Sequence, residues 1–458
     1  MQFLAGQDMK ALLEETAARS VRYWAAVGGM PVAPQPQDIA RLEGLGGPLP
    51  QNPSDPKETL ALLDDFGSPA TVATTGGRYF GFVIGGALPA AVAANWLAGI
   101  WDQNAALSVM SPVAAKIEEI VSAWIIELLG LPRSSGAGFV TGTTMANFSA
   151  LAAARTALLQ RAGWDVEEAG LFGSPPLRVV VGAEAHVSLL KALALLGLGR
   201  SRVIPVPADD QGRMKAGALP ELDERTLICI QAGNVNTGAF DPAEEICSRA
   251  HEVGAWVHVD SAFGLWAAVS PRYAPLLKGF NLADSWAIDC HKWLNVPYDS
   301  GIAVVRAPEH LRKAMTFSAA YLQTSDVREP SHYTPESSRR ARGIEMWAAM
   351  RSLGRQGVRA LIERNCRFAR VFAEGFQQAG FEVLNEIVLN QVLVCFGSAE
   401  ETRRVIADVQ DEGTCWCGGT QWLGRTAMRI SVSSWATTEE DVERSLAAIL
   451  SIAKRRKS

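Results

Sequence analysis

One lysine of this sequence stands where a free ammonium group is expensive to keep. Lys292 lies between His291 and Trp293, directly after the apolar run "SWAID" of residues 285–289. A charged amine at the end of a buried strand must be paired, exposed by a loop or consumed in a reaction. The last of these options would make Lys292 a nucleophile that forms a covalent bond with a carbonyl group.

Three further polar sites also follow apolar runs. Thr143 and Thr144 stand in "VTGTTMAN", His186 in "GAEAHVSLLK" and Asp260 in "WVHVDSAFG". Singly, each has an ordinary interpretation: threonine caps helices, a lone aspartate caps a helix or pairs with a cation, and a lone histidine is usually structural. The glycine before the two threonines also allows a strand to turn into a helix whose free N–H groups bind an anion.

Together these side chains fit the requirements of one cofactor, pyridoxal 5′-phosphate. Its aldehyde needs an amine, its ring nitrogen needs an anion, and its phosphate needs the start of a helix. Lys292 would then be stored as a Schiff base instead of a bare ammonium group, and His186 could lie flat against the ring and transfer protons.

The elements that must position these residues alternate between strand and helix. From Phe139 to about residue 306, short continuous apolar runs alternate with helical patterns, which is typical of a mainly parallel sheet covered on both faces. In such a sheet, ligands bind at the carboxyl ends of the strands, where all four polar sites fall. After Arg339, a long helical region followed by short strands and helices predicts a smaller α+β unit. Before it, helices mixed with Pro/Gly-rich connectors predict a segment that packs on something else.

Composition excludes several classes of protein. The 458 residues are 48% hydrophobic and 20% charged, with a net charge of −5, which is typical of a globular protein without a nucleic-acid footprint. The seven scattered cysteines indicate a reducing compartment, and we expect a cytoplasmic protein with no membrane segment. The "CWC" at residues 415–417 lacks nearby partner ligands, so we expect packing cysteines and no metal.

The segments "HVDSAFG" and "ADSWAIDCHKWLNVPYDSG" resemble the group II pyridoxal-phosphate-dependent amino-acid decarboxylases. The resemblance runs from about Arg78 to the C-terminal helix. It implies an aspartate-aminotransferase-like fold (fold type I) with a mainly parallel seven-stranded sheet. The implied units are residues 1–77, packed on a dimer partner, a large cofactor-binding domain at 78–338 and a small α+β domain at 339–458.

The resemblance also implies roles for individual residues. Lys292 would carry the cofactor, Asp260 would pair with the ring nitrogen, and Ala262 and His186 would cover the two faces of the ring. The residues implied at the phosphate are Thr143, Thr144 and His291, with Ser300 a weaker candidate. Asp289 often corresponds to Asn in aromatic decarboxylases, and an anion near a phosphate is unfavourable unless it is paired. It is therefore left out of the predicted site.

Other residues are implied at the substrate. Arg429 in "AMRISVSSW" matches an arginine that meets the substrate carboxylate in glutamate-type members, with a buried ion pair as the alternative. Phe82 in "YFGFVIGG" would line the substrate side of a site shared across a homodimer. Tyr333, on a loop around residues 326–338 that would close over the site, is the candidate proton donor, although a tyrosine that merely packs there is nearly as well supported.

The expected reaction is decarboxylation of an L-amino acid, with an aromatic substrate favoured. The alternatives are an acidic substrate, an aldehyde synthase that couples decarboxylation to oxidative deamination, and a carbon–carbon lyase. A silent scaffold is a further alternative, and the intact set of Lys292, Asp260 and His186 argues against it.

Overall fold

The computed structural model describes residues 8–316 and 328–457, and its centre is a seven-stranded sheet. The strand order is β1-β7-β6-β5-β4-β2-β3. Strand β7 runs antiparallel to both of its neighbours, β1 and β6, and the other neighbouring pairs are parallel. The bounds are β1 Gly136–Val140, β2 Arg178–Gly182, β3 Ile204–Val206, β4 Thr226–Gln231, β5 Trp256–Asp260, β6 Ser285–Asp289 and β7 Gly301–Val305.

Helices bury both faces of this sheet. Alternate residues of the strands point to opposite faces, so Val179 and Val181 belong to one hydrophobic cluster and Val180 to the other. One face packs against α7 (Thr143–Arg161), α9 (Val187–Leu195) and α11 (Pro308–Met315). The other face packs against α6 (Pro112–Leu128), α10 (Ala243–Glu252) and part of α12 (Gly343–Gln378). Burial on both faces explains why the strands read as continuous apolar runs.

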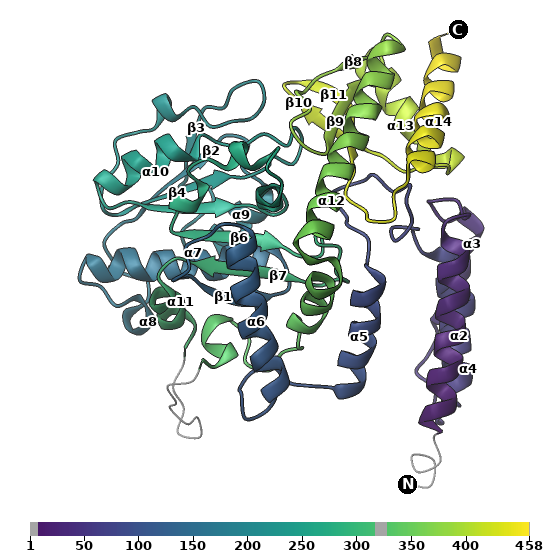
Figure 1. Ribbon diagram of the computed structural model, residues 1–458, viewed down its shortest axis with the longest axis horizontal. Coiled ribbons are helices and arrows are strands. Elements are labelled where there is room, and N and C mark those ends of the chain that lie inside the picture. Colours follow the sequence, from purple (N-terminus) through teal and green to yellow (C-terminus); the bar gives the residue numbers. More distant parts are fainter. Residues whose placement is uncertain (1–7, 317–327, 458) are drawn as a thin grey trace.

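A second, smaller sheet of order β10-β11-β9-β8 belongs to the C-terminal part. All of its neighbouring strands are antiparallel. Helix α12 runs from the large sheet to this small one (Figure 1), and it is interrupted at Gly354, whose φ of 59° is in the left-handed region that favours glycine. The bounds are β8 Glu382–Val383, β9 Gln391–Cys395, α13 Ala399–Glu412, β10 Gly418–Trp422, β11 Arg425–Ser431 and α14 Glu439–Lys457.

The N-terminal segment forms a pair of helices at one side of the molecule (Figure 1). Helix α2 (Met9–Val27) lies beside α4 (Pro56–Gly67), and an ion pair of 2.9 Å joins Arg19 to Asp64. Short α3 (Pro36–Arg41) precedes α4, and α5 (Pro89–Trp101) leads back to the large sheet. Several large apolar side chains of α2, α4 and α5 are exposed: Leu13, Val21, Trp24, Leu62, Leu63, Trp96, Leu97, Ile100 and Trp101.

The remaining elements are short. They are α8 (Val166–Ala169) and seven 3₁₀ turns at Leu42–Leu45, Ser68–Ala70, Ala216–Ala218, Gly264–Val269, Ala274–Leu277, Phe280–Leu282 and Pro330–Tyr333.

The predicted fold class is confirmed: the chain has a mainly parallel seven-stranded sheet with a smaller α+β unit after it. The boundaries at residues 77 and 338 stay predictions. Strand β10 was missed, because "GGTQW" has two glycines and polar residues, and its pairing with β11 supplies what its own sequence does not.

Candidate active site

The predicted chemical residues gather at one edge of the large sheet. Helix α7 begins with Thr143 just after β1, and His186 follows β2. Asp260 is the last residue of β5, and its register partner on β6 is Ala287. Asp289 ends β6 opposite Gly301, and Lys292 follows three residues later. The parallel strands thus bring together side chains from four separate parts of the sequence.

Lys292 lies on the loop that connects β6 to the antiparallel β7. Its ammonium nitrogen is 2.9 Å from Asp289 Oδ2, and its side chain is 22% exposed. Backbone N–H groups of Cys290 and His291 donate to Ser300 O at 3.0 and 3.2 Å, which ties the two ends of the loop together. The loop therefore holds Lys292 from a closed base, with part of its side chain exposed.

Asn295 joins this loop to two other segments, and sequence reasoning missed it. It is fully buried, and its φ of 56° is one that asparagine tolerates better than most residues. Its Oδ1 accepts hydrogen bonds from the N–H groups of Gly86 at 2.7 Å and Trp435 at 2.8 Å, and its Nδ2 donates to Ser433 O at 3.0 Å. It thus holds the N-terminal linker and the small sheet's exit segment against the Lys292 loop. The signal was the polar residue at the end of "HKWLN".

Asp260 is the buried carboxylate of the site. It is 5% exposed, and burial raises its pKa above the ordinary value; the nearby charges of His186 and Lys292 offset only part of this shift. Asn147 Nδ2 lies 3.5 Å from its Oδ2. A carboxylate in this position can keep a proton on an adjacent cationic ring nitrogen.

His186 caps helix α9 with its ring. Its Nδ1 accepts the Ser188 N–H at 3.3 Å and lies 2.7 Å from Ser188 Oγ. With Nδ1 occupied as an acceptor, the neutral ring carries its proton on Nε2. Burial lowers the pKa of His186, and so do the charges of Lys292 and Arg429, while Asp260 raises it. Lys292, Arg429 and Asp260 are therefore close enough to His186 for their charges to act on its ring.

The candidate phosphate cradle lies between β1 and the Lys292 loop. A β-carbon built onto Gly142 would lie 2.9 Å from His291 Cε1 and 3.1 Å from Asp289 Oδ1, so glycine is needed for this approach. Thr143 Oγ1 and Ser300 Oγ are buried, and neither makes a hydrogen bond of standard geometry. His291 Nδ1 accepts the Ser300 N–H at 3.2 Å. Two orphaned hydroxyls beside a histidine and a helix start fit a phosphate group.

Two other predicted cofactor residues lie nearby. Thr144 is half-buried in the first turn of α7, and Ala262 follows β5, where its carbonyl accepts the Asp289 N–H at 3.0 Å.

Asp289 belongs to this site, although the sequence analysis left it out. Its Oδ1 accepts the Thr143 N–H at 2.6 Å and lies 3.5 Å from His291 Nε2, while its Oδ2 pairs with Lys292. Burial raises its pKa, but the charges of Lys292 and His291 outweigh burial, and the net pKa is lowered. The pairing that would make an anion acceptable here is present.

Arg429 reaches the site from β11. One of its nitrogens donates to Asn236 Oδ1 at 3.2 Å, and among residues 8–316 and 328–457 no carboxylate pairs with it. The alternative of a buried ion pair is therefore wrong for the part of the chain that the structure describes. Burial lowers the pKa of Arg429, which is the effect of partial desolvation without a counter-ion.

An aromatic wall, consisting of Tyr79, Phe82 and Trp416, stands beside the Lys292 loop. Trp416 stacks on Tyr79 with ring centroids 5.1 Å apart and on Phe82 with centroids 5.6 Å apart. The Phe82 residue is 61% exposed. The linker that carries two of these rings passes so close to Lys292 O that no side chain would fit at Gly85.

Tyr333 is not brought to this edge of the sheet. It is 8% exposed, the Arg328 guanidinium lies 4.5 Å from its ring centre, and its ring packs beside Gly136, at the opposite end of β1 from Thr143. This placement agrees with the packing interpretation and does not support the role of proton donor. Residues 317–327, which include the start of the expected closing loop, lie outside the described residues.

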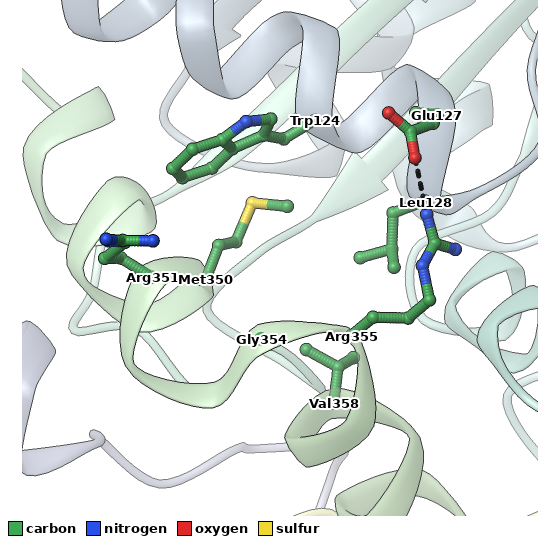
Figure 2. Close-up of a pocket in the computed structure, with 8 residues that line it drawn as sticks. All are labelled: Trp124, Glu127, Leu128, Met350, Arg351, Gly354, Arg355 and Val358. Atoms are coloured by element: carbon green, nitrogen blue, oxygen red, sulfur yellow. Dashed lines mark hydrogen bonds and ion pairs between the residues drawn. The ribbon is translucent and has the colours of Figure 1, made fainter.

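A separate cavity of about 220 Å³ lies between α6 and α12, at the interruption of α12 (Figure 2). Its walls include Trp124 and Met350, and an ion pair of 2.8 Å between Glu127 and Arg355 crosses one side. None of the predicted site residues lines it, so it is not part of the candidate active site. Within the described residues, no helix is both long and apolar enough to cross a membrane.

Comparisons with known proteins agree with this fold and show the family. The family described as "Pyridoxal-dependent decarboxylase conserved domain" matches residues 54–398. Aromatic-L-amino-acid decarboxylase of Bacillus atrophaeus is 26% identical over 416 residues, which cover 86% of this chain and 84% of that protein. Aspartate 1-decarboxylase of Aliivibrio fischeri is 32% identical over 265 residues, 54% of this chain and 48% of that protein. The crystal structure of Oryza sativa TDC with PLP and tryptamine has the same fold, with a TM-score of 0.90, 23% identity and 98% of both chains covered.

Proposed function

We propose that this chain, which belongs to the pyridoxal-dependent decarboxylase family, removes the carboxyl group of an aromatic L-amino acid as CO₂ and releases the amine. Decarboxylation of an amino acid with pyridoxal 5′-phosphate is the family's activity. The observation that carries the individual assignments is the meeting of Lys292, Asp260 and His186 at one sheet edge.

The cofactor, when bound, supplies an aldehyde that captures amines and a cationic ring that accepts the electron pair left behind by CO₂. Lys292 Nζ is the amine that would hold the cofactor and exchange with the amino group of the substrate. Asp260 would hold a proton on the ring nitrogen. The hydroxyls of Thr143 and Ser300, with His291, would bind the phosphate.

His186 Nε2–H is the proton source that we assign to the reaction. Loss of CO₂ leaves a carbon that must gain one proton, and a ring nitrogen whose partner Nδ1 is held by Ser188 is oriented for this transfer. For the balance of protons, His186 would take up a proton from solvent, give its Nε2 proton to this carbon and return to the neutral ring; its lowered pKa makes the protonated ring a stronger acid. The buried position of Tyr333 supports giving this role to His186.

The aromatic preference rests on the aromatic wall. Exposed Phe82, stacked through Trp416 on Tyr79, offers apolar surface to a flat side chain. Arg429 supports a second candidate, an acidic substrate, because a partly desolvated guanidinium without a carboxylate partner binds a side-chain carboxylate well.

A screen of L-amino acids for CO₂ release tests the proposal. Each amine product is identified by mass, and peroxide and aldehyde are measured in the same reactions to detect the oxidative alternative. We expect tyrosine, phenylalanine or tryptophan to give the highest kcat/KM. Preferred turnover of aspartate or glutamate would replace the aromatic proposal with the acidic one, and no CO₂ from any amino acid would overturn both.

We also propose that the protein is a homodimer. The exposed apolar side chains of α2, α4 and α5, which include Trp24, Trp96 and Trp101, are a large surface for a monomer to leave in water. Light scattering on the full chain should give twice the chain mass, and a monomer would refute this proposal. The described cysteines are all free and buried, which supports a reducing compartment such as the cytoplasm.

A further inference from the structure

Behind Asp260, a line of buried polar groups runs away from the candidate active site. Asn147 Nδ2 lies 3.5 Å from Asp260 Oδ2, and Asn147 Oδ1 lies 2.8 Å from His258 Nε2. His258 Nδ1 is 2.9 Å from Ser285 Oγ, and the indole N–H of Trp256 donates to the same oxygen at 2.9 Å. Asn147, His258 and Ser285 are fully buried, so water does not compete for these bonds.

The direction of every hydrogen bond in this line is fixed by its two ends. At one end, an ionised Asp260 can only accept, so Asn147 turns its N–H toward Asp260 and its Oδ1 toward His258 Nε2–H. His258 Nδ1 is then an acceptor, and Ser285 donates its hydroxyl proton to it. At the other end, Trp256 can only donate, and Ser285 Oγ accepts its indole N–H. The line requires a neutral His258, and the N–H that it directs at Asp260 favours the ionised carboxylate.

Within the described part of the chain, the side-chain hydrogen bonds of His258 and Ser285 stay within this line and do not reach Lys292 or His186. The charged and titratable groups near Asp260 are His186, Lys292, Asp289 and the buried thiol of Cys229 on β4. Burying an uncharged histidine and an amide costs free energy unless each is bonded, and a sheet interior is normally filled with apolar side chains. A polar line that ends on one carboxylate oxygen leaves the other oxygen to meet the ring nitrogen.

We propose that His258 and Asn147 are positioning residues that hold the Asp260 carboxylate ionised and aimed at the cofactor's ring nitrogen. This inference rests on the proposed assignment of Asp260. His258 fixes the orientation of the Asn147 amide group through its hydrogen bond, and the Asn147 N–H fixes the position of one oxygen of Asp260. Breaking this line lets the carboxylate rotate or take up a proton, and the ring nitrogen then loses its proton.

The test is ¹⁵N NMR of the holoenzyme loaded with pyridoxal 5′-phosphate labelled at the ring nitrogen. The variants are Asn147→Leu and His258→Leu, which break the line, and His258→Gln, whose amide N–H can still donate to Asn147. The matched control is Ser149→Ala, also buried on α7, where the hydroxyl bonds only to its own helix at Met145 O. Cofactor affinity is measured in parallel by absorbance titration.

We expect the wild-type protein and Ser149→Ala to show the shift of a protonated ring nitrogen. The two leucine variants should move toward the unprotonated shift and lose tenfold or more in kcat, with a smaller loss of cofactor affinity, and His258→Gln should recover most of both. Leucine variants that bind the cofactor and keep the protonated shift would overturn the inference and leave Asp260 in place. An unprotonated wild-type nitrogen would instead overturn the assignment of Asp260 itself.

A milder variant keeps the inference testable if the leucine variants do not fold. Ser285→Ala removes the hydroxyl that donates to His258 Nδ1 and leaves His258 and Asn147 in place. The histidine proton is then no longer confined to Nε2, so we expect a partial move toward the unprotonated shift and a lower kcat. If Ser285→Ala keeps the ¹⁵N shift of a fully protonated ring nitrogen and the wild-type kcat, the proposal that this line positions Asp260 is overturned.

Discussion

Replacing Thr143 with valine should separate cofactor binding from the stability of the fold. Thr143 Oγ1 is buried at the start of α7 and makes no hydrogen bond of standard geometry. Leaving a buried hydroxyl unsatisfied costs about 1–3 kcal/mol, so a methyl group of the same shape should leave the free energy of unfolding unchanged or raise it by up to about 1 kcal/mol. A hydroxyl that donates to phosphate contributes about 1.5–3 kcal/mol. Its loss should weaken cofactor binding roughly 10- to 150-fold.

Thr226 supplies the matched control. It is fully buried at the start of β4, where its hydroxyl donates to Asp223 Oδ1 at 2.6 Å and accepts the Asp223 N–H at 3.1 Å. Thr226→Val removes both bonds and leaves the carboxylate of Asp223 short of a donor. It should therefore lower the free energy of unfolding by about 1–3 kcal/mol without changing cofactor affinity.

The assay pairs two measurements on each variant. Urea unfolding of the cofactor-free protein gives stability, and an absorbance titration with pyridoxal 5′-phosphate gives the dissociation constant. Thr143→Val should change the dissociation constant and leave stability nearly unchanged, whereas Thr226→Val should lower stability and leave the dissociation constant unchanged. If Thr143→Val lowers stability as much as Thr226→Val and leaves the affinity unchanged, the Thr143 hydroxyl is a structural group and the phosphate cradle is misplaced.

Four further outcomes are expected. Lys292→Ala should abolish turnover and the pyridoxyl-modified peptide that borohydride reduction yields from the wild type; survival of either would refute the covalent assignment. Asp289→Asn removes a negative charge beside the phosphate cradle, so inorganic phosphate should bind about tenfold more tightly by calorimetry. An unchanged affinity would show that Asp289 is too far from the phosphate to repel it. Arg429→Gln should leave turnover of aromatic amino acids within about twofold and lower that of acidic ones by about tenfold or more; an equal loss on both classes would assign Arg429 a general role. Burial holds the pKa of His258 at about 3, below its ordinary 6.5, so the unfolded chain binds a proton that the folded chain does not, and stability falls as the pH drops below about 6.5. The stability deficit of His258→Gln should therefore shrink by about 2 kcal/mol between pH 7 and pH 5 in urea unfolding, and a constant deficit would contradict a neutral His258.

The residues at strand ends could be predicted because their chemistry conflicts with their surroundings. Lys292, Asp260 and His186 are polar groups directly after apolar runs, and the parallel sheet brings such positions to one edge. Strand β10 could not be predicted in this way, because its pairing with β11 depends on contacts that "GGTQW" does not encode locally.

The differences between the expected and the observed arrangement at the site have the same origin. Asp289 was left out because sequence alone does not show that Lys292 and the Thr143 N–H neutralise it. Tyr333 was a candidate because its segment falls where a loop was expected, whereas it packs against β1 under Arg328. Asn147 and His258 went unnoticed, because only the three-dimensional arrangement shows that two residues 111 positions apart bond to each other.

Asn295 joins segments with different proposed roles, and this has a practical consequence for engineering the protein. The groups proposed for the bond-breaking chemistry lie at the edge of the large sheet. The aromatic wall and Arg429 come from the linker and the C-terminal part of the chain. Asn295 joins both segments to the Lys292 loop through hydrogen bonds to the backbone of Gly86, Ser433 and Trp435. Residues 79–86 and 416–429 can therefore be replaced together by the corresponding segments of a related protein. Replacements of these segments that keep the three Asn295 hydrogen bonds should change substrate preference and leave the positions of Lys292, Asp260 and His186 unchanged.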